Sequence, residues 1–411
     1  MSTPTPRDLY NNVAALEPLF PTDKAGELRE LAADLMRKSA RLGGALHPVT
    51  RRSVVELLRT MNSYYSNLIE GHNTHPLAIE KALRNDYSTD PALRALQIES
   101  RAHIEVQILI ERRLEENPLT EVSSKEFLCW IHREFYERLP DEFRTVKTAN
   151  GGYDQVTPGT VRSCEVEVGR HIPPTFSSLG KFLDRFATGY TPNQLDPLQR
   201  IVAAAASHHR LAWIHPFLDG NGRVTRLFTH AFFIHTKTDG HRLWMVSRGL
   251  ARRRSEYLDA LASADRQRRN DLDGRGNLSD EGLAHFCRFF LNTAMDQVEF
   301  MTGLLDLDAM QDRILFSADK RTLKTKEADR TPDLLRDLFL RGEMTRGEAT
   351  RILQKPERTA RRVLSGLQEE GLIASDAPGA PVRLGFPTSL VGYYFPRLYP
   401  EGVELEGIQR R

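Results

Sequence analysis

The sequence predicts a mainly α-helical protein with a small β-content. Apolar residues recur at the three- and four-residue spacing of helices along most of the chain, and strand-like patterns are confined to two short regions. The chain has 411 residues, 40% hydrophobic and 27% charged, which is ordinary for a globular protein. A chain of this length has room for two or three domains, each with its own core.

The first helices are predicted over residues 25–44 and 51–70. Gly43 and Gly44 follow the first of these segments and Gly71 follows the second, and glycine commonly ends a helix. The same apolar spacing predicts further helices over 76–85, 91–116, 124–138, 179–187, 196–212, 223–235, 251–268 and 280–304.

The main exception to the helical pattern is the region 144–174. Gly151–Gly152 and Pro158–Gly159 mark turns in it. Residues 164–172 alternate in the manner of a short strand before Pro173, which predicts one arm of a β-hairpin.

The C-terminal part has a pattern of its own. Three short amphipathic helices are predicted at 332–341, 345–353 and 356–370, followed by strand-like segments at 372–374 and 382–384 around a turn. This order is typical of a winged helix-turn-helix. Such modules bind either DNA or protein.

The charges of the third C-terminal helix leave both partners open. Arg358, Arg361 and Arg362 lie on its predicted outer side, as on a recognition helix. Acidic residues nearby, including Glu357 and Glu369, roughly balance them, so the basic surface expected of a DNA-binding module is weak.

Composition also bears on where the protein works. The net charge of +2 gives no general argument for nucleic acid or membrane binding. The cysteines, Cys129, Cys164 and Cys287, form neither a disulfide framework nor a zinc spacing. Residues 1–12 lack the apolar centre of a secretory signal, and no apolar run approaches the ~20 residues that span a bilayer. We therefore expect a cytoplasmic protein that does not insert into membranes.

The segment 215–226, HPFLDGNGRVTR, carries the strongest chemical signal. Its Gly-Asn-Gly turn lets successive backbone N–H groups point into one concavity, at the N-terminus of the helix predicted to follow. Anions bind well at such a place. Arg223 and Arg226, three residues apart, can both reach a polyphosphate there. The pattern indicates a phosphoryl- or nucleotidyl-transfer site.

Two further residues of this segment have predicted roles. Asp219 is the single carboxylate that Mg²⁺ typically takes from protein when phosphates supply its other ligands. His215, with an ordinary pKa of ~6.5, is substantially neutral at pH 7 and is our candidate general base. A metal site made of His208, His215 and His230 is conceivable, but no established metal-ligand spacing supports it.

The same segment resembles the signature of the Fic family, H-P-F-x-[D/E]-G-N-G-R-x-x-R, without a mismatch. The resemblance implies a Fic-type helical core that transfers AMP from ATP to a Tyr, Thr or Ser hydroxyl, with Arg226 near the γ-phosphate and Asn221 and Arg223 near the inner phosphates. The implied nucleotide-binding residues are Gly220, Asn221, Gly222, Arg223, Val224, Thr225 and Arg226.

A second segment, Ser66 to Gly71, resembles the inhibitory motif [S/T]-x-x-x-E-[G/N] of Fic proteins. Ser66 and Glu70 are four residues apart and face the same way from a helix. In the family this glutamate reaches the second motif arginine, here Arg226, and competes with the γ-phosphate. The resemblance therefore implies autoinhibition by Glu70.

Two weaker correspondences extend the resemblance to roughly residues 25–304. Residues 164–174 look like the family's β-hairpin flap, which docks the target protein by strand addition. Residues 253–258 resemble a nucleotide-pocket segment, in which Arg253 and Tyr257 are the candidates. Arg253 stands where the family usually has asparagine and Leu258 where it has a second tyrosine, so the preference for ATP is open.

These observations predict four parts: a helical N-terminal region with the inhibitory helix (1–120), a Fic catalytic core (121–305), a linker (306–330) and a winged-helix domain (331–411). The predicted function is protein adenylylation with Mg²⁺. Two alternatives stay open. In the first, the same site uses another nucleotide donor; in the second, the Fic core serves as the nucleotide sensor of a transcriptional regulator.

Overall fold

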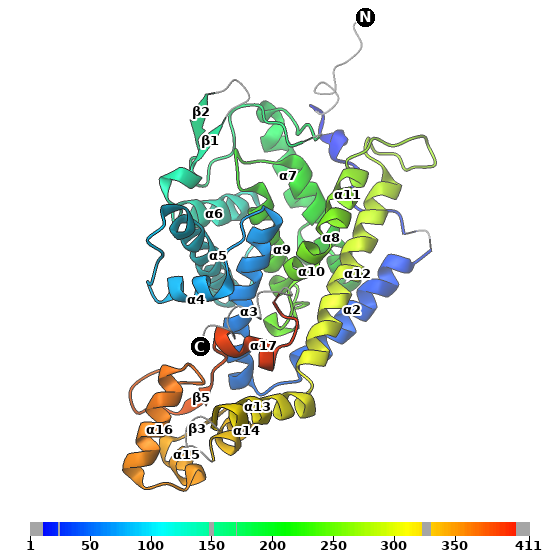
Figure 1. Ribbon diagram of the computed structural model, residues 1–411. Helices are drawn as coiled ribbons and strands as arrows, with labels where there is room; N and C mark the ends of the chain where they lie inside the picture. Colours follow the sequence, from blue (N-terminus) through cyan, green and yellow to red (C-terminus); the bar gives the residue numbers. More distant parts are fainter. Residues whose placement is uncertain (1–10, 24, 148–151, 170, 323–329, 400–411) are drawn as a thin grey trace, which may run out of the picture.

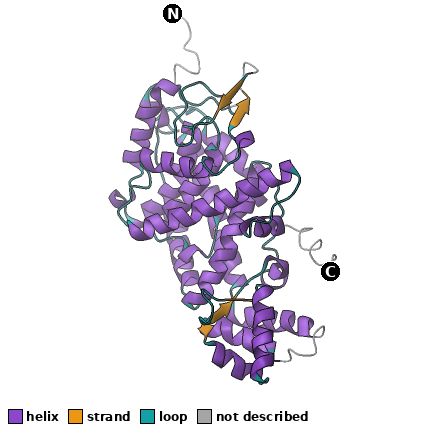
Figure 2. Cartoon of the chain, turned by 90° about the vertical axis from the view of Figure 1, so that its left-hand side faces the viewer, coloured by secondary structure: helices purple, strands orange, loops and turns teal. Residues whose placement is uncertain are grey.

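The computed structural model describes residues 11–23, 25–147, 152–169, 171–322 and 330–399. As predicted, it is mainly helical (Figures 1 and 2). Its α-helices are α2 (Glu27–Gly43), α3 (Pro48–Ile69), α4 (Pro76–Leu83), α5 (Pro91–Glu116), α6 (Lys125–Tyr136), α7 (Leu179–Gly189), α8 (Pro197–Ile214), α9 (Asn221–His235), α10 (Val246–Arg252), α11 (Arg254–Ala264), α12 (Asp280–Leu304), α13 (Leu307–Thr322), α14 (Thr331–Arg341), α15 (Arg346–Leu353), α16 (Glu357–Glu369) and α17 (Val391–Tyr394). Short 3₁₀ helices are η1 (Val13–Leu16), η2 (Asp141–Phe143), η3 (Phe176–Ser178), η4 (Pro192–Gln194), η5 (Gly240–Arg242) and η6 (Thr388–Leu390).

Helices α8 and α9 pack against each other at the centre of the larger, upper part of the molecule in Figure 1. Helix α8 begins with a capping box, in which Asp196 accepts from the N–H of Gln199 and the Gln199 side chain accepts from the N–H of Asp196. Apolar and small side chains of α8 are buried on all sides, because α2, α9 and α12 surround it. The loop that joins α8 to α9 is therefore held at both ends by core helices.

The single helix predicted over 251–268 is wrong, because two shorter helices, α10 and α11, cover residues 246–264. The backbone leaves the helical region at Arg253 (φ −116°, ψ 37°), which separates α10 from α11. The Arg253 side chain turns onto α12, with its guanidinium carbon 4.8 Å from the centre of the Phe289 ring. This packing fixes the break.

The strands of the region 144–174 lie earlier than the predicted hairpin arm. β1 (Thr145–Lys147) pairs antiparallel with β2 (Tyr153–Gln155). In the predicted flap, 164–174, the described residues form a single bridge between Val168 and His171, and Arg170 lies outside the described residues. The predicted strand over 164–172 is therefore wrong. The Arg162 side chain donates hydrogen bonds to the carbonyls of Cys164 (2.9 Å) and Pro174 (2.5 Å), so these two carbonyls are not paired with a neighbouring strand.

The C-terminal part contains α14, α15 and α16 and a three-stranded antiparallel sheet. The strands are β3 (Glu343–Met344), β4 (Ile373–Ala374) and β5 (Val382–Leu384), in the order β3-β5-β4. The three predicted helices and the two predicted strands are present within a few residues. β3, which was not predicted, lies just before the second helix, and Thr345 caps that helix.

The predicted linker, 306–330, is a helix over most of its described length. Met310 and Ile314 of α13 are fully buried, and α13 packs on α14. Residues 323–329 of that linker lie outside the described residues.

The C-terminal part packs on α3, the helix that ends at the predicted inhibitory motif (Figure 1). Arg383 of β5 donates to Ser53 Oγ at 2.6 Å near the start of α3. Near its end, the buried Tyr65 hydroxyl donates to the carbonyl of Leu398 at 2.6 Å. Helix α3 is thus held along its length by a segment more than 300 residues away in sequence.

In the part of the chain that the structure describes, no helix combines the length and the apolar character needed to cross a bilayer. Charged residues interrupt even the longest helices, α5 and α12.

Candidate active site

The loop between α8 and α9 starts at His215 and has a fixed shape. His215 ends α8 in the left-handed region (φ 49°, ψ 61°), and its carbonyl accepts from Arg162 Nε at 2.9 Å. The Asn221 side chain closes the loop by accepting from Phe217 N (2.9 Å) and donating to Phe217 O (2.8 Å). The Phe217 ring is buried and stacks on His132 at 4.1 Å. Asn221 was predicted to bind nucleotide, but its side chain is engaged in these two hydrogen bonds to the Phe217 backbone.

The imidazole of His215 is neutral at physiological pH. Burial lowers its pKa to about 3, and the nearby charges of His171 and Arg162 act in the same direction. A neutral imidazole keeps a lone pair free to accept a proton. The expectation that His215 is neutral near pH 7 therefore agrees with its surroundings.

The N-terminus of α9 forms the predicted concavity. Gly220 precedes the helix with φ 78°, and the first helical bond runs from Val224 N to Gly220 O at 2.9 Å. The N–H groups of 221–223 come before this bond, at the positive end of the helix. A side chain at Gly220 would also collide with the Tyr136 ring, since its Cβ would lie 2.5 Å from a ring carbon.

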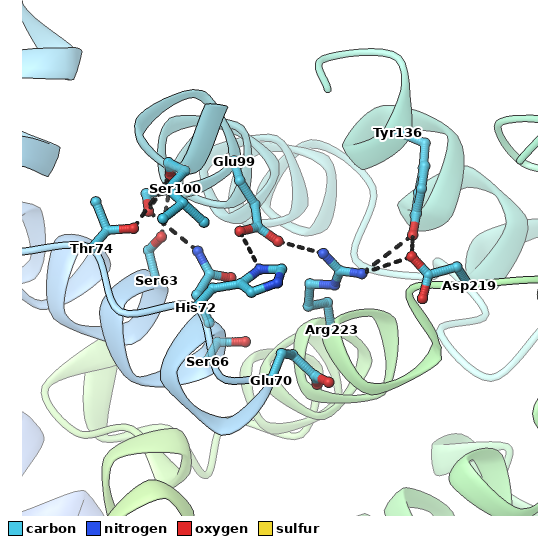
Figure 3. Close-up of polar contacts among 12 residues, drawn as sticks. Ser63, Ser66, Glu70, His72, Thr74, Glu99, Ser100, Tyr136, Asp219 and Arg223 are labelled. Atoms are coloured by element: carbon cyan, nitrogen blue, oxygen red, sulfur yellow. Dashed lines mark hydrogen bonds and ion pairs between the residues drawn. The ribbon is translucent and has the colours of Figure 1, made fainter. Parts of the chain in front are cut away.

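Asp219 lies beside this helix end with a partly exposed carboxylate. Its Oδ2 accepts from the Tyr136 hydroxyl at 2.7 Å and from Arg223 Nη2 at 3.1 Å (Figure 3). Burial raises the pKa of Asp219, but Arg223 and the Tyr136 hydroxyl outweigh it and the net pKa is lowered. Asp219 is therefore ionised at neutral pH.

Arg223 is buried and points along the loop rather than into the concavity. One terminal nitrogen donates to Glu99 Oε1 of α5, and the other faces Asp219 and, at 3.3 Å, the Tyr136 hydroxyl (Figure 3). In this arrangement Arg223 orients Asp219. To contact the inner phosphates as predicted, Arg223 would have to share its hydrogen bonds to Glu99 and Asp219 with the phosphates or give them up.

Arg226, one turn further along α9, contacts the predicted inhibitory motif. Its Nε donates to Ser66 Oγ at 2.9 Å, and its Nη2 donates to Ser66 O at 3.0 Å and to Glu70 Oε1 at 2.6 Å. Burial raises the pKa of Glu70, but Arg226 and Arg223 outweigh it, so the pKa is lowered and the carboxylate is charged. Ser66 and Glu70, the two predicted inhibitory residues, are thus hydrogen-bonded to Arg226, the arginine predicted to bind the γ-phosphate.

Gly222 makes this approach possible. A Cβ at Gly222 would lie 2.3 Å from Glu70 Oε1 and 3.1 Å from Arg226 Nη1. The second glycine of the loop therefore leaves room for the Glu70 carboxylate at the mouth of the concavity.

The remaining predicted nucleotide contacts lie elsewhere. The side chains of Val224 and Thr225 are buried in α9. The Tyr257 hydroxyl is buried and hydrogen-bonds to His208 Nε2 at 2.8 Å, while Arg253 is paired with Glu256 on the surface of α11. Tyr257 also lies close to Arg226, whose charge and hydrogen bond lower its pKa against the larger effect of burial. Arg253 contacts Thr293 and Phe289 of α12 besides Glu256.

The donor set at the loop fits a cation shared with phosphates. Asp219 offers one charged, 42% exposed carboxylate beside the N–H groups that would face phosphates. One or two carboxylates plus substrate phosphates is the usual protein contribution to a Mg²⁺ site. No cluster of three or more His, Cys, Asp or Glu side chains able to hold a metal occurs among the described residues.

Glu99, Tyr136 and His72 belong to this site and were missed. Glu99 is fully buried on α5, and His72 Nδ1 contacts its Oε2 at 2.7 Å. A signal for Glu99 exists in the sequence. It occupies the apolar face of α5 between Ala95 and Ala102, where an acidic residue is rare unless it is paired.

The sequence model of the Fic/DOC family matches residues 122–233, which include the whole loop from His215 to Arg226. Residues 122–233 therefore match a Fic domain. Its Fic domain is similar to the protein adenylyltransferase Fic of Drosophila mojavensis, with 33% identity over 102 residues, covering 25% of this chain and 20% of the fly protein. The protein adenylyltransferase Fic of Nematostella vectensis is 29% identical over 171 residues, covering 42% of this chain and 36% of that protein. The chain thus matches only a fifth to about a third of the length of these relatives.

The fold of the chain is similar to that of a solved Fic family protein from Desulfovibrio desulfuricans. The TM-score is 0.51 at 19% identity, and the alignment covers 89% of this chain and 97% of the other. The similarity concerns the fold alone and extends beyond the segment matched by the family model.

Proposed function

We propose that this Fic protein transfers AMP from ATP to a Tyr, Thr or Ser hydroxyl of a target protein or of itself, and that Glu70 holds the activity low. The observation that carries the proposal is the 2.6 Å ion pair between Glu70 Oε1 and Arg226 Nη2. It joins an inhibitory-type motif to the last residue of a complete Fic loop. The similarity of the Fic domain to proteins named adenylyltransferases supports the choice of reaction.

In the proposed reaction the target hydroxyl attacks the α-phosphorus of ATP. The bond from that phosphorus to the bridging oxygen breaks, and pyrophosphate leaves. The hydroxyl proton passes to the neutral imidazole of His215. Positive charge from the first N–H groups of α9 and from Arg226, once Glu70 has moved, stabilises the phosphates. A Mg²⁺ ion on Asp219 would add further neutralisation of phosphate charge.

Asp219→Ala in a Glu70→Gly background should lower the rate by about 10²-fold, the usual scale for losing one electrostatic contact to a transition state. The dependence of the rate on Mg²⁺ should flatten as well, because the Asp219 carboxylate beside the helix end is gone. A Mg²⁺ titration of pyrophosphate release measures both. Asp259→Ala, which removes an exposed carboxylate from α11, is the control. Undiminished Mg²⁺ stimulation in the Asp219 variant would rule out the metal role.

The pH profile should carry the signature of the buried base. Since burial lowers the pKa of His215 to about 3, the imidazole loses its proton as pH rises through that value and is fully available above about pH 5. We expect kcat of the Glu70→Gly protein, at saturating ATP and Mg²⁺, to stay level from pH 5.5 to 7.5. If kcat instead fell below a midpoint near pH 6.5, and this midpoint shifted with substitutions around His215, the lowered pKa of His215 would be contradicted.

Incubation with ATP and Mg²⁺ followed by intact-mass measurement tests the reaction itself. Addition of one AMP to the Glu70→Gly protein is expected, and a mass unchanged in all conditions would refute adenylylation. Parallel incubations with other nucleotide donors test the alternative suggested by Arg253 and Leu258, which stand where the family usually has asparagine and tyrosine. Modification from UTP but not ATP would favour that alternative.

We also propose that the predicted domain 331–411, of which the structure describes residues 331–399, is a winged helix-turn-helix, from the order helix, strand, two helices, two strands. On α16, Arg361 is paired with Glu357, which weakens a basic surface. A gel-shift assay on genomic fragments, run beside self-modification, separates an enzyme from a nucleotide-sensing regulator. DNA binding that responds to ATP without any transfer would favour the regulator. The target protein of the enzyme would dock on 164–174, where Val168 is exposed.

A further inference from the structure

Glu99 is a charged side chain placed where charge is costly. It lies on the inner face of α5 with no solvent exposure, and both of its oxygens are used. Oε1 accepts from Arg223 and Oε2 contacts His72 Nδ1 at 2.7 Å (Figure 3). A fully buried carboxylate is retained only when it is paired and hydrogen-bonded in this way.

The Glu99 carboxylate joins the end of α3 to the catalytic loop. On one side, His72 follows Gly71, and the His72 N–H donates to the carbonyl of Asn67 at 3.0 Å, which fixes it to the helix end. On the other side, Arg223 passes the contact on to Asp219 at 3.1 Å. The result is one unbroken row of polar contacts, His72–Glu99–Arg223–Asp219 (Figure 3).

The charges in this row decide how Asp219 behaves. Arg223 is buried between two carboxylates, Glu99 and Asp219. While the Glu99 carboxylate neutralises most of the positive charge of Arg223, the Asp219 carboxylate is only weakly held by Arg223. It therefore remains available to bind a cation. If Glu99 were neutral, the buried guanidinium would depend for its compensation on Asp219 and on the more distant Glu70, and on Asp219 once Glu70 is replaced. Asp219 would then be a poorer ligand.

We propose that Glu99 is a positioning residue that keeps Arg223 neutralised and oriented so that Asp219 is free to bind a divalent cation together with nucleotide phosphates. The role rests on the proposed function of the loop. It acts through Arg223 and involves no contact between Glu99 and the substrate.

The experiment measures how much Mg²⁺ strengthens ATP binding, with no turnover needed. ATP is titrated calorimetrically into the Glu70→Gly/His215→Ala protein, with and without Glu99→Gln, once in EDTA and once in Mg²⁺. We expect Glu99→Gln to reduce the Mg²⁺-dependent gain in affinity by about tenfold, on the usual scale of coupling between two sites. The affinity in EDTA should stay equal or rise, because Arg223 becomes a freer cation for phosphate.

Glu111→Gln is the matched control. Glu111 is a buried carboxylate on the same helix, paired with Arg59 and Arg242, about three turns from Glu99. The substitution Glu111→Gln should leave the Mg²⁺-dependent gain in ATP affinity unchanged, even if it lowers the melting temperature as much as Glu99→Gln does. His72→Ala, which removes the other partner of Glu99, should change the gain in the same direction as Glu99→Gln and by less.

Two results would overturn the role of Glu99. One is an unchanged Mg²⁺ gain in Glu99→Gln. The other is an equal loss of affinity in EDTA and in Mg²⁺, which would mark Glu99 as structural. Failure of adenylylation is seen separately, as absence of AMP transfer by the Glu70→Gly protein with His215 intact. If no variant bound ATP at all, both the proposed function and this role would be contradicted.

Discussion

Glu70→Gly should raise the rate of self-adenylylation and of pyrophosphate release by about 5- to 150-fold, the range of typical coupling between two sites. In the wild-type protein the Glu70 carboxylate holds Arg226 Nη2 at 2.6 Å, so the arginine cannot serve a γ-phosphate at the same time. The substitution removes that charge and also loosens the end of α3. Both effects expose Arg226.

Two companion substitutions separate these effects. Glu70→Gln keeps the length of the side chain and its helix preference while removing the charge, so it should retain most of the gain if competition for Arg226 is the cause. Glu70→Asp should be intermediate, because its shorter arm keeps the charge at a greater distance from Arg226. Rates are compared at saturating ATP by intact mass and by pyrophosphate release, which should rise together.

A Glu70→Gly protein no faster than wild type at saturating ATP would exclude autoinhibition by this residue. The contact with Ser66 and Arg226 would then only anchor α3. A gain in Glu70→Gly that Glu70→Gln lacks altogether would assign the effect to the flexibility of the helix end instead of the charge.

The sequence was most informative where the structure is local. The loop from His215 to Gly222 is shaped by features that lie within it or at its ends: the capped helix before it, a glycine with φ 78° and a short asparagine bond back to Phe217 N. The position of Ser66 and Glu70 on one helix face also follows from their spacing. That this face meets Arg226, 156 residues away, followed only from the resemblance to the Fic family.

The parts that escaped prediction depend on tertiary packing. β1 and β2 are exposed on nearly every residue, so they show no alternation of apolar and polar residues that would mark a strand. Tyr257 lies in a motif-like segment, but its hydroxyl turns inward to His208. Glu99 reaches Arg223 across 124 residues of sequence, and only its place on an apolar helix face hinted at a partner.

His215→Ala should remove at least 10²- to 10⁴-fold of the transfer rate in the Glu70→Gly background, the contribution typical of a general base. The affinity for ATP should change little, because in the proposed reaction the imidazole receives a proton only in the transition state and the phosphates are bound by α9 and Arg226. Intact mass gives the rate, and calorimetric titration of ATP gives the affinity. The exposed His285 on α12 provides the control, since His285→Ala removes an imidazole far from the loop in sequence and should leave both quantities unchanged.

The paired measurement is what identifies a base. If His215→Ala weakened ATP binding as much as it slowed transfer, His215 would be a binding residue, and the left-handed turn at its backbone would be the feature that matters. If the variant modified itself at the rate of its parent, proton removal by His215 would be excluded. The loss expected here is confined to kcat because the loop keeps its shape without the imidazole. Asn221 closes the loop onto Phe217, and Arg162 holds the carbonyl of residue 215, so neither contact uses the side chain that is removed.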